Sequence, residues 1–323
     1  MMDSKESLQY ALGALLYTPA SNANIADRIL CRYWPGLSSV SLCLEDAIQA
    51  SGLQEAERQL KKTLHALCEA KAEDLPAIFI RVRNPEHLAH VHQLIAEDEE
   101  VLTGFIFPKF DLSNGEGYLK TLQKINHQQN KKLYCMPILE SRQIASTLTR
   151  KENLRAVHDL VDQYAEDVLN IRVGGNDFSN LYGLRRKVNQ TIYDLGVVRD
   201  ILIDILNVFA DDYVVSGPVW EYYGENQDEP WAVGLKKELE LDRANGFIGK
   251  TCIHPSQIKL INESMRVSCE DYEDAKQILG WNDSTLGVAG SHLGNRMNEV
   301  QCHTRWASMI LQRAQSFGIE EEK

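Results

Sequence analysis

Eight short apolar runs recur along this chain, and their spacing constrains the fold more than any other feature. Successive runs begin about 25–45 residues apart, the length of one strand–helix unit in a (β/α)8 barrel. The segments between them carry a helical period in places, and one clear apolar face is formed by Leu53, Ala56, Leu60, Leu64 and Leu67. The eight predicted strands lie at 13–18, 40–44, 77–82, 101–107, 133–138, 168–173, 213–216 and 250–253.

This alternation predicts an α/β fold with a parallel sheet, and eight units favour a TIM barrel. A doubly wound open sheet is the alternative, but no G-x-G-x-x-G follows the first predicted strand. Beyond about residue 265 the pattern changes to helices separated by four glycines, Gly280, Gly287, Gly290 and Gly294. We therefore expect a barrel domain at 1–265 and a C-terminal helical extension at 266–323, with a glycine-bearing lid loop.

Charge and cysteine usage narrow the class of protein. The formal net charge of −12 argues against nucleic acid or an anionic membrane as a partner. The most apolar helical region, 197–215, is interrupted by charged residues and predicts no membrane span. Seven cysteines without a C-x-x-C pair favour a reducing compartment over a disulfide scaffold. Because the N-terminus also lacks the pattern of a signal peptide, we expect a cytoplasmic protein.

Two carboxylates follow neighbouring predicted strands. The run at 168–173 opens through Gly174 and Gly175 onto Asp177, and the run at 133–138 leads to Glu140. The carboxyl ends of barrel strands share one face, so these side chains should be neighbours. Two carboxylates with open positions suit Mg²⁺, which keeps water and substrate as its other ligands. The alternative is that each acid only caps the helix that follows it.

Cationic residues end two other predicted strands. Arg81 and Arg83 are two residues apart and should point to the same side of their strand. An inward-facing arginine needs an anion, which is either a substrate carboxylate or the Glu45–Asp46 pair after the second strand. Lys109 either holds that acidic pair or contacts substrate, and the structural role is favoured. We interpret His254, which stands before Pro255, as a structural histidine at a helix start.

A set of motifs resembles one known family. The segment 246–258, GFIGKTCIHPSQI, is similar to the GFxGKxxIHPSQ segment of citrate lyase β-subunit-like proteins in the HpcH/HpaI aldolase superfamily. Segment 231–242 looks more like the divergent subgroup of C–C bond lyases of the TIM-barrel fold that occurs near bacterial stress and tellurium-resistance genes. The resemblance covers most of residues 12–280, and its other motifs, in family order, are LEDA at 44–47, IRV at 80–82, FPK at 107–109, ILE at 138–140 and GGND at 174–177.

The resemblance implies a Mg²⁺-dependent barrel, with Mn²⁺ as the alternative metal, that cleaves or forms a C–C bond next to a carbonyl through an enolate. It implies metal ligation by Glu140 and Asp177, and contact of Arg81 with the substrate carboxylate and the enolate. The predicted catalytic residues are Arg81, Glu45 and Asp46, and the predicted substrate contacts are Arg81, Arg83 and Lys109. The substrate would be a small carboxylate, and the family implies a homo-trimer or hexamer.

Three departures from the family pattern leave alternatives open. Cys43 stands where the family usually has an aspartate, and the segment 13–20 lacks the arginine and serine that lie near a coenzyme A thioester. At the C-terminus, 296–299 is a weak counterpart of GKMID, which places Asn298 or Glu299 where the family has its lid acid. The substrate is therefore either a 2-oxo acid or a β-hydroxyacyl thioester of coenzyme A. The alternative function is a catalytically silent barrel that acts as a binding or scaffolding subunit.

Overall fold

The computed structural model describes residues 4–282 and 285–321. It divides into two compact units. One unit is Leu12–Ile261, and the other joins the described residues before Leu12 to those after Ile261. Residues 4–11 therefore group with the described part of the C-terminal segment, a long-range association that no local sequence pattern indicates.

The larger unit is a barrel of eight parallel strands, which confirms the predicted fold class. Neighbouring strands follow the order β7-β6-β5-β4-β3-β2-β1-β8. A parallel bridge between Gly217 and Lys250 joins the two edge strands, β7 and β8. The strands are β1 (Ala14–Pro19), β2 (Ser39–Cys43), β3 (Ala77–Arg81), β4 (Gly104–Phe107), β5 (Tyr134–Leu139), β6 (Ile171–Val173), β7 (Val215–Ser216) and β8 (Lys250–Cys252).

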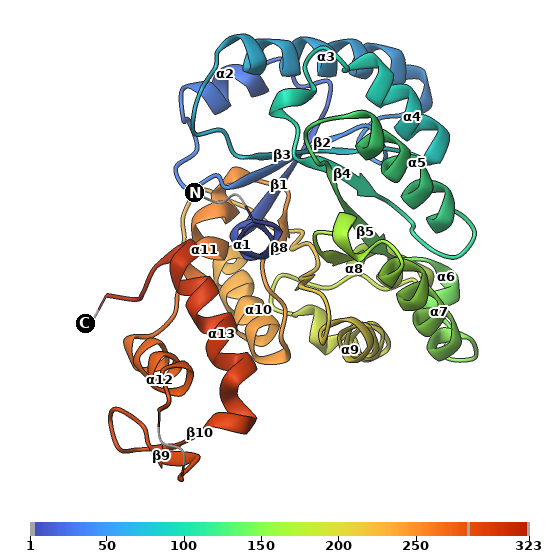
Figure 1. The fold of residues 1–323 in the computed structure, drawn as a ribbon. Coiled ribbons are helices and arrows are strands. Elements are labelled where there is room, and N and C mark those ends of the chain that lie inside the picture. The colour runs from blue at the N-terminus through green and yellow to red at the C-terminus, as the bar shows by residue number, and fades with distance from the viewer. Residues whose placement is uncertain (1–3, 283–284, 322–323) are drawn as a thin grey trace. The chain divides into compact units, whose positions relative to one another are not determined.

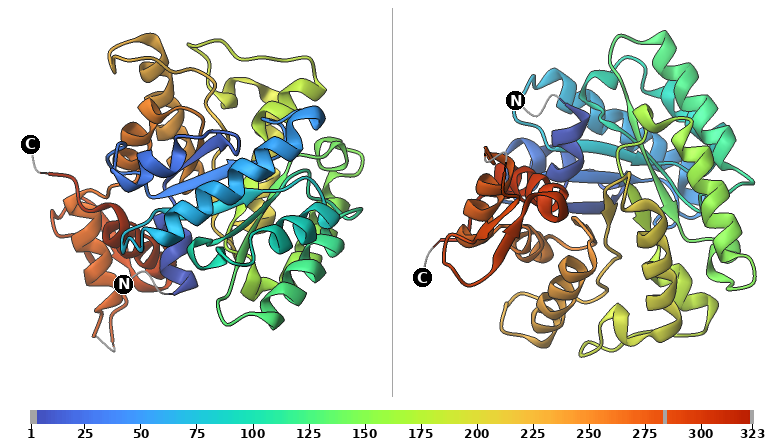
Figure 2. Two further views of the ribbon diagram at one scale, coloured as in Figure 1. Left: turned by 90° about the horizontal axis from the view of Figure 1, so that it is seen from above. Right: turned by 60° about the horizontal axis from the view of Figure 1, so that its bottom comes forward.

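Helices alternate with these strands and lie outside the sheet (Figures 1 and 2). The predicted apolar face at 53–67 lies on α3, where Ala56, Leu60, Leu64 and Leu67 are fully buried. The α-helices of this part of the chain are α2 (Ile25–Leu30), α3 (Leu53–Glu69), α4 (Pro85–Leu94), α5 (Gly115–Gln128), α6 (Arg142–Ala145), α7 (Arg150–Asp162), α8 (Gly175–Leu181), α9 (Gly196–Phe209), α10 (Pro230–Asn245) and α11 (Ile258–Ser264).

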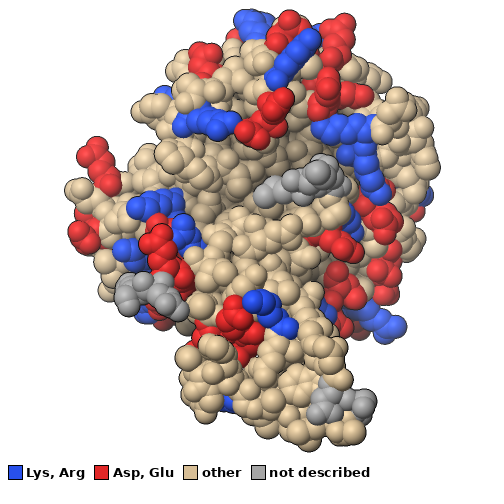
Figure 3. Space-filling view, turned by 60° about the vertical axis from the view of Figure 1, so that its left-hand side comes forward, with Lys and Arg blue, Asp and Glu red and all other residues tan. Residues whose placement is uncertain are grey.

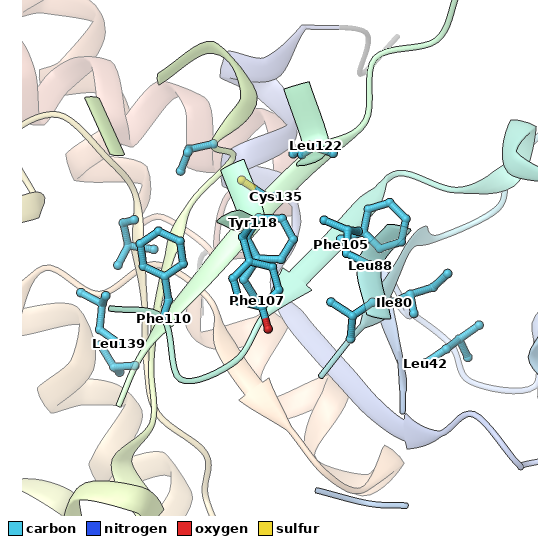
Figure 4. Close-up of a cluster of buried hydrophobic side chains, with 14 of the residues drawn as sticks. Leu42, Ile80, Leu88, Phe105, Phe107, Phe110, Tyr118, Leu122, Cys135 and Leu139 are labelled. Atoms are coloured by element: carbon cyan, nitrogen blue, oxygen red, sulfur yellow. The ribbon is translucent and has the colours of Figure 1, made fainter. Parts of the chain in front are cut away.

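The largest buried cluster lies between the strands and these helices. Figure 4 shows Leu42 of β2 and Ile80 of β3 in one cluster with Leu88 of α4 and Tyr118 of α5. Successive residues of a strand face opposite sides of a sheet. Because Ile80 faces the helices, its neighbour Arg81 is directed to the inside of the barrel. The packing of Ile80 against the helices thereby directs the side chain of Arg81 into the barrel.

All eight predicted strands are present, but three of them begin two or three residues later than their apolar runs do. Residues Glu99–Val101 form a 3₁₀ helix, so β4 begins only at Gly104. β6 is limited to Ile171–Val173, and β7 to Val215–Ser216. An apolar run marks burial rather than sheet hydrogen bonding, and the buried residues before each short strand belong to the connection.

The smaller unit is mainly helical and contains α1 (Lys5–Ala11), α12 (Cys269–Leu279) and α13 (Val300–Phe317). Val267, Ala275 and Ile278 pack against Ala307 and Ile310 in its own small core. Ser268 caps the N-terminus of α12, because its side chain accepts a hydrogen bond from the Asp271 N–H at 3.0 Å. The glycine-bearing stretch includes an antiparallel pair, β9 (Val288–Gly290) and β10 (Met297–Glu299).

Surface charge is mixed. On the face shown in Figure 3, Lys and Arg side chains lie beside Asp and Glu side chains rather than gathering in one basic area. None of the seven cysteines, all of which lie in the described part of the chain, forms a disulfide. Within the described ranges, no helix combines the length and the apolar character needed to cross a membrane.

Candidate active site

A cavity of about 220 Å³ lies at the carboxyl ends of the barrel strands. This volume is below the roughly 300–1,000 Å³ of pockets for drug-sized ligands, so the cavity suits a small molecule. Its charged and polar lining comes from six different strands or the loops that follow them. These residues are Tyr17, Asp46, Arg81, Glu140, Arg172, Asn176, Asp177 and Thr251.

Glu140 and Asp177 are neighbours in this cavity, as the sequence predicts. Glu140 follows β5 and is buried, and Asp177 lies in the first turn of α8. Burial, and then the negative charge of Asp177, raise the pKa of Glu140 to about 8. Two carboxylates held this close favour a cation between them.

Gly174 leaves the space that the Glu140 side chain occupies. A Cβ atom on Gly174 would lie 2.2 Å from Oε2 of Glu140, so another residue would displace the carboxylate. The backbone N–H of Lys109 donates to Oε1 of Glu140 at 2.8 Å. Lys109 has a φ of 49°, which is unusual for a residue other than glycine. The strained backbone directs its N–H at the carboxylate.

The residues present fit Mg²⁺. Within residues 4–282 and 285–321, no group of three or more His, Cys, Asp or Glu side chains could hold a metal ion. Glu140 and Asp177 instead offer two carboxylates, and the open cavity leaves the other positions to water and substrate. That is the donor set by which Mg²⁺ is usually held.

Arg81 is tied to the acidic pair that follows β2. Its Nη2 lies 2.8 Å from Oε2 of Glu45, 2.9 Å from Oδ2 of Asp46 and 3.6 Å from Oε1 of Glu140. Burial disfavours the charged guanidinium, but the negative groups around it outweigh burial and raise the pKa of Arg81. The Nε of Arg81 is buried without a hydrogen-bond partner. One donor of Arg81 therefore remains for a ligand.

Lys109 completes this network, and Arg83 lies apart from it. The Lys109 ammonium contacts Glu45 and lies 3.1 Å from Oδ1 of Asp46.

The Arg83 guanidinium donates from Nε to the carbonyl of Leu44 at 2.7 Å and also binds the carbonyl of Ile48. Strand β3 ends at Arg81, so the alternation that would place Arg83 on the same side stops before it. Glu45, Lys109 and Arg83 are not among the residues that line the cavity. Arg83 and Lys109 as substrate contacts stay predictions.

His254 begins the 3₁₀ helix η5 (Pro255–Gln257), as predicted. Its Nδ1 accepts a hydrogen bond from the Ser256 N–H at 3.3 Å, and its ring stacks on Tyr223 with the centroids 4.3 Å apart. Burial lowers the pKa of His254. These contacts support the structural interpretation of this histidine.

In the smaller unit, the two residues considered for a lid acid differ in their surroundings. Asn298 is buried, and its amide donates to Oε1 of Gln277 at 2.7 Å. Glu299 immediately precedes α13, and its backbone N–H donates to Nδ1 of His303 at 3.0 Å. A catalytic role for Glu299 stays a prediction.

Sequence reasoning missed Arg172. It is the middle residue of β6 and is 1% exposed, yet it lines the cavity beside Tyr17 and Thr251. Its Nη2 donates to Oγ1 of Thr251 at 2.8 Å. Burial lowers the pKa of Arg172, in contrast to that of Arg81. The available signal was a single arginine inside the apolar run at 168–173.

The fold and the cavity define the class: a (β/α)8 barrel with a charged cavity at the carboxyl ends of its strands is an enzyme architecture. A sequence model of the family described as "C-C Bond Lyase of the TIM-Barrel fold" matches residues 6–319. The chain therefore belongs to this family of carbon–carbon bond lyases, which confirms the resemblance seen in its motifs. A search of curated proteins found no match.

Solved structures with the same fold include proteins named as citrate lyases. One, from Burkholderia xenovorans LB400, is 15% identical with a TM-score of 0.72, over 97% of this chain and 94% of that chain. CitE from Mycobacterium tuberculosis, in complex with magnesium, acetoacetate and coenzyme A, is 18% identical with a TM-score of 0.62, over 95% and 99% of the two chains. A citrate lyase β subunit from the same organism, with oxaloacetate and magnesium, is 16% identical with a TM-score of 0.54, over 80% and 98%. At such identities these structures show the fold.

Proposed function

We propose that this chain is a Mg²⁺-dependent lyase or aldolase that cleaves or forms a C–C bond next to a carbonyl, through an enolate. The observation that carries this proposal is the convergence of Glu140, Asp177 and Arg81 in one small cavity. Relatives of the same fold bind magnesium together with oxaloacetate or acetoacetate, which supports the assignment. Mn²⁺ is the alternative metal, because it also accepts oxygen ligands.

Glu140 and Asp177 would hold the metal. When bound, Mg²⁺ acts as a Lewis acid and supplies roughly several kcal/mol of stabilisation to negative charge that develops on an adjacent carbonyl oxygen. Lys109 keeps Glu140 in place through its backbone N–H. The hydrogen bond from the Lys109 N–H to Glu140 and the space left by Gly174 orient the carboxylate before any ligand arrives.

Arg81 would stabilise the enolate. Its unpartnered Nε can donate to an oxygen on which charge develops, and its buried position strengthens that interaction. Glu45 and Asp46 hold the guanidinium through Nη2, so we assign them to the positioning of Arg81. Lys109 offsets the charge of that acidic pair.

We propose a small free 2-oxo acid as the substrate, in preference to a coenzyme A thioester. The cavity of about 220 Å³ suits such an acid. The segment 13–20 also lacks the arginine and serine that the family motif places near a thioester. We further propose a homo-trimer or hexamer, which light scattering of the purified protein would test.

Calorimetric titration of Mg²⁺ in the presence of oxaloacetate or pyruvate tests the function. We expect metal-dependent binding of the acid by wild type and its loss in Asp177→Asn, a variant of equal size. Asp200→Asn, at an exposed acid that pairs with Arg199 on α9, is the matched control and should bind as wild type does. Absence of Mg²⁺ and 2-oxo-acid binding in wild type would instead favour a non-catalytic barrel that serves as a binding or scaffolding subunit.

A further inference from the structure

Arg172 is a buried cation without an acidic partner. Its side chain is 1% exposed, and Nε and Nη1 have no hydrogen-bond partner. The remaining nitrogen, Nη2, donates to the neutral hydroxyl of Thr251, and the neutral hydroxyl of Tyr17 also lies close to the guanidinium. Among the described residues, no Asp or Glu forms an ion pair with Arg172. A guanidinium is always charged, so burying one without an anion is costly.

The other deeply buried arginines of the barrel all have acidic partners. Arg81 pairs with Glu45 and Asp46. Arg150 lies 2.8 Å from Asp204, and Arg186 lies 2.7 Å from Glu238. The same chain therefore provides acids for its buried guanidiniums elsewhere, which makes the missing acid at Arg172 informative.

Arg172 lines the cavity that holds the proposed catalytic groups. A divalent metal would offset Glu140 and Asp177, and Arg81 with Lys109 offsets Glu45 and Asp46. The charge that remains in the cavity is that of Arg172. An anionic group of a ligand would balance it.

We propose that Arg172, with Tyr17 and Thr251 beside it, binds the carboxylate of the substrate, and that Arg81 is thereby left for the reacting oxygen. This assignment rests on the proposed function. In Arg81, Nη2 is paired with Glu45 and Asp46, and Nε is the buried nitrogen without a hydrogen-bond partner. In Arg172, both Nε and Nη1 are buried without a hydrogen-bond partner. Ile138 and Val173 also line the cavity and suit a short carbon chain. The ligand class is a short 2-oxo acid bound through its carboxylate.

The test is calorimetric binding of oxaloacetate and pyruvate to wild type, Arg172→Met and Arg172→Lys, each with Mg²⁺ and with EDTA. We expect Arg172→Met to weaken binding of both acids about tenfold or more, because charge-assisted hydrogen bonds are lost. Arg172→Lys should recover part of that affinity. Mg²⁺ binding without acid should not weaken in either variant, because Arg172 offers no metal ligand and its positive charge opposes the ion.

Thermal unfolding separates ligand binding from a structural role. Without ligand, Arg172→Met should melt no lower than wild type, because it removes an unpaired buried charge. Arg150→Met, which removes a buried arginine that has an acidic partner, is the matched control: it should melt lower and, if folded at the assay temperature, bind acids as wild type does.

Two outcomes would overturn the inference. If Arg172→Met binds both acids within about twofold of wild type while Asp177→Asn has lost Mg²⁺, the nitrogens of Arg172 are satisfied by internal water, and the proposed function stands without this assignment. If wild type binds neither Mg²⁺ nor a 2-oxo acid, the proposed function fails and this assignment fails with it.

Discussion

Two buried cations of the barrel, Arg172 on β6 and Lys250 on β8, have opposite surroundings. Lys250 is fully buried, and its Nζ lies 2.9 Å from Oε1 of Glu238 and 2.6 Å from Oδ2 of Asp242. Both acids belong to α10. Arg172 meets the hydroxyl of Thr251 and no acid. Because Lys250 and Thr251 are consecutive in β8, they face opposite sides of the sheet.

The cluster around Lys250 is closed by the protein itself. Glu238 also accepts from Nη1 of Arg186 and, at 2.6 Å, from the backbone N–H of Ile192. Asp242 accepts from the hydroxyl of Tyr193 at 2.7 Å. Lys250 and Arg186 are thus each paired with buried acids, although Nε of Arg186 has no hydrogen-bond partner, whereas Arg172 on the cavity side is paired with no acid. We expect a buried cation that is paired within the protein to stabilise the fold, and an unpaired one on a cavity to bind an anionic ligand.

The largest expected effect comes from breaking the closed cluster. Lys250→Met should lower the free energy of unfolding by roughly 3–5 kcal/mol, because it leaves buried acids with one cation fewer. Urea unfolding followed by circular dichroism measures this loss. Arg172→Met is the paired measurement and should lose little or nothing. Equal losses in the two variants would remove the distinction between the clusters.

Neutralising one acid in the cavity should affect ligand binding rather than folding. Glu140→Gln keeps an acceptor for the Lys109 N–H but removes one metal ligand. We expect Mg²⁺ affinity to fall by about 100-fold. Loss of a residue that only supports a metal ligand typically costs about 10–100-fold, and loss of a ligand itself should cost at least the upper end of that range. Calorimetry measures the affinity, with Asp200→Asn as the control. A variant that binds Mg²⁺ as wild type does would show that Glu140 is not a ligand.

Metal binding should depend on pH through Glu140. With its pKa near 8 in the metal-free site, Glu140 is protonated at lower pH, and Mg²⁺ must displace the proton. Affinity should therefore rise with pH up to about 8, by as much as about tenfold per pH unit, and then level off. Titration at pH 7 in buffers of different ionisation enthalpy should show the release of about one proton.

Glu140 should also make the stability of the metal-free protein depend on pH. Its contribution to the free energy of unfolding should fall as pH rises, whereas Mg²⁺ affinity should rise. The pKa of Glu140 is higher in the folded chain than its usual value of 4.5, so the folded state holds the proton more tightly. In metal-free protein its contribution to the free energy of unfolding is present at low pH and is lost as pH rises from about 4.5 to about 8. Glu140→Gln should lack this part of the trend, and an unchanged pH profile would contradict the assignment.

The smallest expected effect tests the space beside Glu140. Gly174→Ala should displace the carboxylate and weaken Mg²⁺ binding about tenfold, the scale of an outer-shell change. Gly196→Ala is the matched control, because the nearest atom to its Cβ would lie 4.0 Å away. Unchanged Mg²⁺ affinity in Gly174→Ala would show that the close approach of Gly174 to Glu140 is not needed for the metal.

Much of the fold could be predicted from local pattern. The spacing of eight apolar runs predicts the barrel, and acids directly after two consecutive strands predict that Glu140 and Asp177 are neighbours. Both predictions are confirmed, because the carboxyl ends of parallel strands share one face. The position of His254 at a helix start is confirmed too, since histidine before proline is a local signal.

Where the strands end could not be predicted from local pattern. Arg83 was expected beside Arg81, but β3 stops at Arg81, and Arg83 binds the main chain after β2. The grouping of α1 with the C-terminal segment was also missed, because its partner, α13, is far away in sequence.

The order of strands, the helices between them and the acids at their ends follow from residue spacing, which acts over a few neighbours. Whether a buried charge is paired depends on groups brought together from distant elements. Arg172 and Thr251 are 79 residues apart, and only the closed barrel places them in contact. Lys250 finds its acids on α10, whereas Arg172, on the cavity side, finds none. Tertiary structure alone therefore separates the cation that holds the fold from the one left for a ligand.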